Sequence, residues 1–204
     1  FAGWVAERSG ESPRAVFDDL WARFEAGVRH DTFDRWLVER GRAPAERDGM
    51  IDAYRRHRPR LSAYADVVPA LDGLRGVARL GLISEGFRAV QEAKLDALGL
   101  RPRFDKVVVL GEDERPDWKP SRRPFDRWLA GEAIAPEEAI YIGDNPAKDF
   151  LGARRAGWRS LRIRRVDGLH RDEEPTQGEA RPDREAADLR SLASILESFE
   201  AESA

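Results

Sequence analysis

The spacing of apolar side chains divides this sequence into two parts. In residues 1–60, apolar positions recur at the interval typical of amphipathic helices. The clearest of these helices begins at Ser12-Pro13, a hydroxyl N-cap followed by proline at the first helical position. Its apolar face consists of Val16, Phe17, Leu20, Trp21, Phe24 and Val28. Because no strand pattern interrupts these helices, residues 1–60 are predicted to form a small helical layer.

From about residue 66, short apolar runs alternate with amphipathic helices. The runs are residues 80–84, 106–110, 139–143 and 160–164. Helices are expected near residues 66–77, 87–98 and 124–130, and between the third run and residue 156. This alternation is typical of parallel β-α-β units, whose strands are buried on both faces. We therefore predict an α/β fold for residues 61–204, with a Rossmann-like parallel sheet flanked by helices.

The last forty or so residues show two further patterns. Residues 165–185 are mostly charged residues, proline and glycine, which predicts a flexible surface loop. Residues 186–203 are predicted to form a C-terminal helix. Its apolar face consists of Leu189, Leu192, Ile195, Leu196 and Phe199.

Composition narrows the possible classes of protein. The chain has 204 residues, of which 41% are hydrophobic, so it can build one domain with a modest insertion. Its 35 basic and 38 acidic side chains give a net charge of −3, which offers no electrostatic reason to expect a nucleic acid or membrane partner. No apolar run approaches the roughly 20 residues needed to cross a bilayer, and no signal peptide opens the sequence. We expect a cytoplasmic monomer.

Cysteine and histidine give no sign of a metal or redox site. The sequence contains no cysteine, which excludes disulfides, thiolate metal sites and a cysteine nucleophile. The histidines at positions 30, 57 and 170 lack metal-ligand spacing, so we expect them to be surface residues.

Candidate chemistry lies where the predicted strands end, because ligands of open α/β sheets bind at the carboxyl ends of the strands. The first strand ends in Ser84-Glu85-Gly86 at the start of a helix, where a hydroxyl and free N–H groups suit a phosphoryl group. The alternative is that Ser84 only caps the helix. Lys119 follows the second strand and has the charge to neutralise a phosphate, although an ordinary surface lysine fits there too.

The third strand carries a pair of acids. Asp144 lies at the end of this strand, and Asp149 lies in the first turn of the next helix, after Pro146. Two hard oxygen ligands at one sheet edge suit Mg²⁺, which accepts one or two protein carboxylates and keeps most of its waters. The alternative is that the acids pair with the helix dipole and bind no ion.

This order of serine, lysine and paired acids resembles the haloacid dehalogenase-like hydrolase superfamily, phosphatase type. Residues 82–86, Leu-Ile-Ser-Glu-Gly, are similar to its second motif, and Lys119-Pro120 is similar to the third. Residues 141–149, Tyr-Ile-Gly-Asp-Asn-Pro-Ala-Lys-Asp, resemble the fourth motif and are the most specific part of the match. Many members carry a helical cap before the second motif, so the resemblance implies that residues 1–60 are a cap.

The resemblance implies a Mg²⁺-dependent phosphatase that acts on a small phosphorylated metabolite through an aspartyl-phosphate intermediate. In that role Ser84 would bind a phosphoryl oxygen, and Lys119 would hold the phosphoryl group and the nucleophile. Asp144 would coordinate the ion, and Asp149 would coordinate it or orient its waters. The remaining substrate-binding candidates are Glu85, Gly86 and Trp118. Glu85 departs from the usual Asn or Asp, and Trp118 fits either a pocket wall or simple packing.

One family motif is absent from the sequence. The first motif, a strand ending in Asp-x-Asp, supplies the nucleophile and the general acid/base, but the acids at 18–19 and 31–34 follow no strand. The chain also begins with Phe1 rather than methionine. We expect that some tens of upstream residues carry a central strand between those ending at Ser84 and Asp144, and that residues 1–204 alone are inactive. The alternative is a non-catalytic binding or scaffolding module with the same fold.

Other functional classes fit less well. In receiver domains the acidic pair comes first and the lysine last, which is the reverse of the order here. Both G-x-G-x-x-G and G-x-x-x-x-G-K-[ST] are missing, which disfavours a nucleotide-binding domain. A haloacid dehalogenase in the strict sense needs no metal, whereas the acidic pair favours one. Basic clusters such as residues 55–58 lack interleaved aromatic residues, so a solvated face is favoured over an RNA site.

Overall fold

The computed structural model describes residues 1–28 and 31–201. The chain divides into two compact units, Phe1–Pro59 (unit 1) and Arg60–Ala204 (unit 2). Within the part that the structure describes, no helix is long and apolar enough to cross a membrane.

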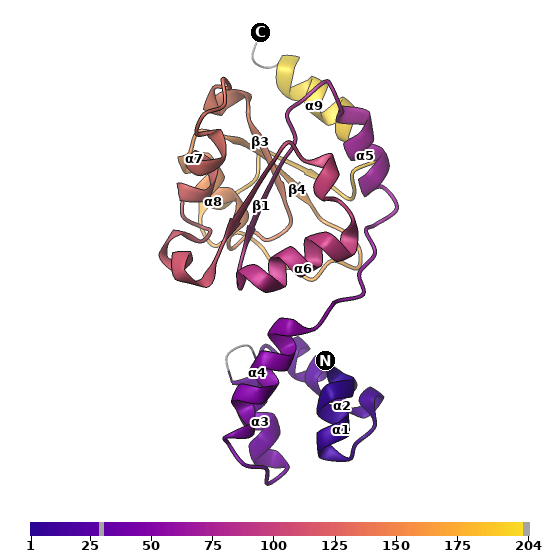
Figure 1. The fold of residues 1–204 in the computed structure, drawn as a ribbon. Helices are drawn as coiled ribbons and strands as arrows, with labels where there is room; N and C mark the ends of the chain where they lie inside the picture. The colour runs from indigo at the N-terminus through magenta and orange to yellow at the C-terminus, as the bar shows by residue number, and fades with distance from the viewer. Residues whose placement is uncertain (29–30, 202–204) are drawn as a thin grey trace. The chain divides into compact units, whose positions relative to one another are not determined.

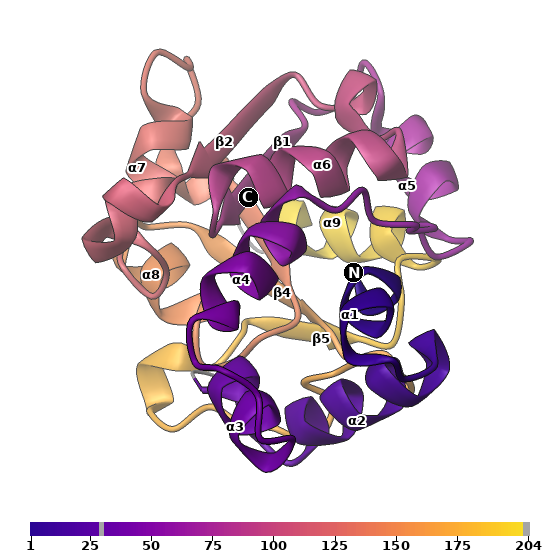
Figure 2. The ribbon, with the colours of Figure 1, turned by 60° about the horizontal axis from the view of Figure 1, so that its bottom comes forward.

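Unit 1 is helical, as the spacing of apolar residues predicts (Figure 2). Its helices are α1 (Ala2–Ser9), α2 (Pro13–Glu25), α3 (Thr32–Glu39) and α4 (Glu46–Arg56). The Ser12 hydroxyl accepts a hydrogen bond of 3.1 Å from the Ala15 N–H and so caps α2 as expected. The buried core of the unit is formed by Val5, Ala6, Val16, Trp36, Leu37 and Met50.

The apolar face of α2 is buried only in part. Val16 is fully buried, but Phe17 and Trp21 are 49% and 47% exposed. The Trp21 ring stacks between Phe17 and Phe24, and its indole N–H donates to Glu25. Helical periodicity identifies an apolar face, but it does not say how much of that face another element covers.

Unit 2 has the predicted α/β architecture, and strands β1 to β4 lie within one residue of the predicted apolar runs. Its strands are β1 (Gly81–Glu85), β2 (Lys106–Leu110), β3 (Ile140–Gly143), β4 (Arg159–Ile163) and β5 (Arg184–Ala186). Its helices are α5 (Val67–Leu74), α6 (Arg88–Leu98), α7 (Arg123–Leu129), α8 (Asp149–Arg155) and α9 (Leu192–Ala201). Short 3₁₀ turns lie at Arg101–Arg103, Glu112–Asp117, Pro136–Glu138 and Gly178–Ala180.

The strands form two parallel sheets. Strand β1 pairs with β2, with Ser84 opposite Val109, and β3, β4 and β5 pair in that order, with Ile142 opposite Leu161. Among the residues described, β1 and β3 each pair with one strand only, so each has one open edge. Figure 1 shows α7 and α8 on one side of unit 2 and α5 and α9 on the other.

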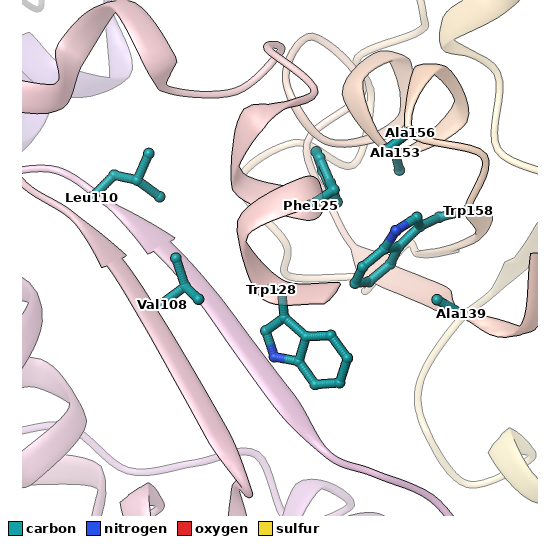
Figure 3. Packing of buried hydrophobic residues seen from close by; sticks show 8 residues of the cluster. All are labelled: Val108, Leu110, Phe125, Trp128, Ala139, Ala153, Ala156 and Trp158. Carbon is teal, nitrogen blue, oxygen red and sulfur yellow. The ribbon is translucent and has the colours of Figure 1, made fainter. Parts of the chain in front are cut away.

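An aromatic core joins the two sheets. Figure 3 shows side chains from β2 and from helices α7 and α8 that converge on one cluster. Its edge-to-face ring contacts run from Tyr141 to Phe125, on to Trp158, and then to Trp128, with centroids 5.0, 5.5 and 5.7 Å apart. Such geometry adds about 0.5–1.5 kcal/mol per pair beyond the burial of apolar area. The cluster fixes the two sheets relative to each other although they share no strand.

The segment predicted as a flexible loop, residues 165–185, is instead tied to the sheet. It contains a 3₁₀ turn at Gly178–Ala180 and leads into β5, which pairs with β4. Strand β5 has the sequence Arg-Glu-Ala, which carries no apolar alternation, so the sequence pattern could not reveal it. The C-terminal helix is also shorter than the predicted 186–203. Residue 186 belongs to β5, α9 begins at Leu192, and residues 202 and 203 lie outside the described residues.

Candidate active site

Lys119 forms a buried ion pair with Asp149. Its ammonium group donates to Asp149 Oδ1 at 2.6 Å and to the Tyr141 hydroxyl at 2.7 Å. The side chains of Lys119 and Asp149 are only 11% and 5% exposed. Burial acts to lower the pKa of Lys119, but the oxygens of Tyr141 and Asp149 outweigh it and hold the pKa above its ordinary range. The lysine is therefore a fixed positive charge at the carboxyl ends of the strands.

Asp149 also organises the loop that follows β3. Its Oδ2 accepts hydrogen bonds from the backbone N–H groups of Asp144 and Asn145, at 3.1 and 2.9 Å. A Cβ atom at Gly143 would lie 2.5 Å from this oxygen, so the carboxylate approaches the chain at a place where only glycine leaves room. With two donors on each oxygen, Asp149 has used about all of its acceptor capacity. In this structure it holds Lys119 and the loop after β3 in place, and its coordination of an ion or of the ion's waters stays a prediction.

Asp144 contrasts with Asp149. Its side chain is exposed, and among the described residues its carboxylate accepts no hydrogen bond from another side chain. Although the residue is exposed, neighbouring protein atoms displace part of the water around its carboxylate; this desolvation raises the pKa of Asp144, and the negative charge of Asp149 adds to the effect. Asp144 is thus the member of the acidic pair whose oxygens are available to a ligand.

Glu85 connects three segments of the site. One carboxylate oxygen accepts the backbone N–H of Lys119 at 2.6 Å, and the other accepts the Lys148 ammonium group at 3.0 Å. The Glu85 side chain is 8% exposed, which shields its bond to the Lys119 N–H, whereas the Lys148 side chain is 48% exposed. Glu85 thereby fastens the end of β1 to the lysine segment and to the loop before α8.

The remaining predicted site residues lie at the end of β1 and beside β2. Ser84 donates to Gln91 Oε1 at 3.0 Å, a contact that helix capping does not explain. Gly86 has φ of 137°, and a Cβ there would lie 2.7 Å from the Gln91 amide nitrogen. Trp118 packs against the aromatic core, and its indole N–H donates to the Gly111 carbonyl at 2.9 Å. These contacts are those of a packing residue, and a role of Trp118 in substrate binding stays a prediction.

Comparison with known proteins agrees with this arrangement. The haloacid dehalogenase-like hydrolase family matches residues 2–157. This chain belongs to that family. A phosphoserine phosphatase of Thermus thermophilus is 37% identical over 205 residues, which cover 94% of this chain and 77% of that protein. A glyceraldehyde 3-phosphate phosphatase of Methanopyrus kandleri is 36% identical over 137 residues, which cover 67% of this chain and 57% of that protein.

Solved structures show the same fold. The hydrolase YfnB of Bacillus subtilis, whose structure contains magnesium, superimposes with a TM-score of 0.63 at 24% identity, covering 87% of this chain and 77% of that one. A haloacid dehalogenase-like phosphatase of Thermococcus onnurineus gives a TM-score of 0.57 at 21% identity, covering 96% and 86%. These structures show the fold, and the phosphatase relatives place the chain among the phosphatase-type members of the haloacid dehalogenase-like family.

Sequence reasoning missed several residues of this haloacid dehalogenase-like site. The sequence predicts Tyr141 only as part of a strand, whereas its buried hydroxyl contacts both Lys119 and Asp149. His170 was expected at the surface, yet its side chain lies 3.1 Å from Asn145, beside the acidic pair. Alternation within β3 could have suggested Tyr141, but no local signal links His170 to a loop 25 residues away. His57 is half-buried rather than fully at the surface, and His30 lies outside the described residues.

Replacing Glu85 with alanine is expected to destabilise unit 2 by about 1–3 kcal/mol, because the buried N–H of Lys119 loses its acceptor. Urea unfolding would measure the change. Lys148→Ala is the matched control, since it removes only the half-exposed partner and should cost under about 1 kcal/mol. Equal losses for the two variants would contradict the role assigned to the Glu85–Lys119 bond.

Proposed function

We propose that this chain provides most of a Mg²⁺-dependent phosphatase for small phosphorylated metabolites. The observation that supports it best is the buried Lys119–Asp149 pair beside the open carboxylate of Asp144, at the carboxyl ends of parallel strands. Relatives that act on phosphoserine and glyceraldehyde 3-phosphate favour a small phosphomonoester as substrate.

The donor set of the acidic pair fits a magnesium ion. Mg²⁺ is commonly held by one or two carboxylates together with waters and substrate phosphate oxygens. Asp144 supplies such a carboxylate, whereas Asp149, occupied by four donors, holds the Asp144 loop and Lys119 in place. When bound, the ion would neutralise charge on the phosphoryl oxygens.

The other residues of the chain would bind and orient the phosphoryl group. Lys119 keeps its positive charge and would attract a phosphoryl oxygen and the attacking carboxylate. Ser84 would donate its hydroxyl to a second oxygen after exchanging its bond to Gln91. Because Lys119 is already held by Asp149 and Tyr141, it would need little reorganisation during the reaction.

The nucleophile in this proposal is an aspartate of an Asp-x-Asp segment outside residues 1–204. The open edges of β1 and β3 support a strand between them that would carry this segment to Lys119 and Asp144. Unit 1 would serve as the cap that shields the reaction from water and selects the substrate.

The test is the release of phosphate from an aryl phosphate with and without Mg²⁺. Residues 1–204 alone should be inactive, and a longer chain with the Asp-x-Asp segment should turn over only with Mg²⁺. Robust activity of residues 1–204 alone would contradict the external nucleophile. A folded longer chain without any phosphatase activity would favour the binding or scaffolding module.

A further inference from the structure

The segment between β4 and β5 reaches the loop that carries Asp144. In this segment, His170 Nε2 lies 3.1 Å from Asn145 Nδ2, and His170 Nδ1 lies 2.9 Å from Glu173 Oε1. The carboxamide oxygen of Asn145 accepts the backbone N–H of Ala147 at 2.9 Å, which directs its NH₂ group toward the histidine. An NH₂ group can only donate, so Nε2 is the acceptor and the ring proton lies on Nδ1, facing Glu173.

A buried arginine holds this segment in place. The side chain of Arg162, on β4, is fully buried and donates to the backbone carbonyls of His170 and Glu173, at 2.8 and 2.7 Å. A buried guanidinium group is costly unless its donors are paired, so these two carbonyls are strongly constrained to stay where they are. The backbone at His170 and at Glu173 is therefore anchored to β4.

We propose that His170 is a positioning residue for the loop that carries Asp144. Glu173 fixes the histidine tautomer, and His170 Nε2 fixes the carboxamide of Asn145. Asn145 then holds the Ala147 N–H and with it the turn that presents Asp144. The proposal rests on the proposed function in one respect only, the role of Asp144 as an ion ligand.

The first test measures amide hydrogen exchange and the side-chain NMR signals of residues 1–204. His170→Phe keeps a planar ring but removes the acceptor, so the Ala147 amide should exchange roughly five- to tenfold faster, as expected for loss of about one hydrogen bond. His170→Gln, whose carboxamide oxygen can accept in place of Nε2, should restore protection. In Glu173→Ala the Nδ1–H group loses its acceptor, so the Nδ1–H tautomer should no longer be favoured. The imidazole ¹⁵N shifts would show this change, and the core should be unaltered.

The control is His57→Phe, the same substitution at a half-buried histidine of unit 1. Protection of the Leu161 amide in β4 reports whether unit 2 stays folded in each variant. Unchanged exchange at Ala147 in a folded His170→Phe protein would overturn the proposal. A loss of protection at Ala147 in His170→Gln equal to that in His170→Phe would overturn it too.

A second measurement separates this proposal from the function of the site. Binding of Mg²⁺ alone, followed through the backbone amide shifts of residues 144–149, should weaken about tenfold in His170→Phe and recover in His170→Gln. If Mg²⁺ shifts none of these amides in the wild-type chain, the ion role of Asp144 is wrong, and the exchange result still decides the role of His170. If Mg²⁺ binds equally to wild type and His170→Phe while exchange at Ala147 changes, the histidine positions the turn but not the ion ligand, which overturns its link to Asp144.

Discussion

Replacing Asp149 with alanine is expected to lower the free energy of unfolding of unit 2 by about 3–5 kcal/mol. The substitution leaves the Lys119 ammonium group buried without its counter-ion. It also removes the acceptor of two backbone N–H groups, those of Asp144 and Asn145. Equilibrium unfolding in urea, monitored through the buried tryptophans of unit 2, would measure the loss.

Two variants separate this effect from the ordinary cost of removing a charge. Asp126→Ala breaks an exposed ion pair with Arg122 in the same unit and should cost about 0.5 kcal/mol or less. The double variant Lys119→Met with Asp149→Leu removes both charges and should recover part of the stability. If Asp149→Ala were no more destabilising than Asp126→Ala, the buried Lys119–Asp149 pair would not stabilise unit 2 as expected.

Replacing Asp144 with asparagine is expected to lower phosphate release about a thousandfold, equal to about 4 kcal/mol, in a chain that also carries the Asp-x-Asp segment. The carboxamide keeps the size of the side chain but loses the charge that would hold Mg²⁺. Stability should change little, since the side chain is exposed and makes no side-chain hydrogen bond among the described residues. Steady-state kinetics at several Mg²⁺ concentrations would measure the effect.

The matched control for this prediction is Asp172→Asn, which changes an acid that is 93% exposed in the same unit. Its turnover and its requirement for Mg²⁺ should equal those of the unsubstituted protein. Full activity of Asp144→Asn would refute the assignment of the ion ligand, whereas equal losses in both variants would indicate a general effect of charge.

The sequence by itself determined the fold class and the family. Alternation of apolar runs with helices predicted the parallel architecture, because strands buried on both faces need continuous apolar stretches. The motif around Asp144 and Asp149 carried the family assignment, since its residues are contiguous in the chain. Helix starts such as Ser12-Pro13 were also readable, because capping depends on neighbouring residues.

Only the tertiary structure decided which of the two acids is buried and paired, and which residues distant in the sequence contact them. Asp149 and Asp144 look alike in the sequence, but burial beside Lys119 makes one a positioning group and leaves the carboxylate of the other open. The backbone at His170 and Glu173 is held by Arg162, whose buried guanidinium group donates to the carbonyls of both residues. Such contacts follow from three-dimensional packing and desolvation, which leave no periodic signal in the order of residues.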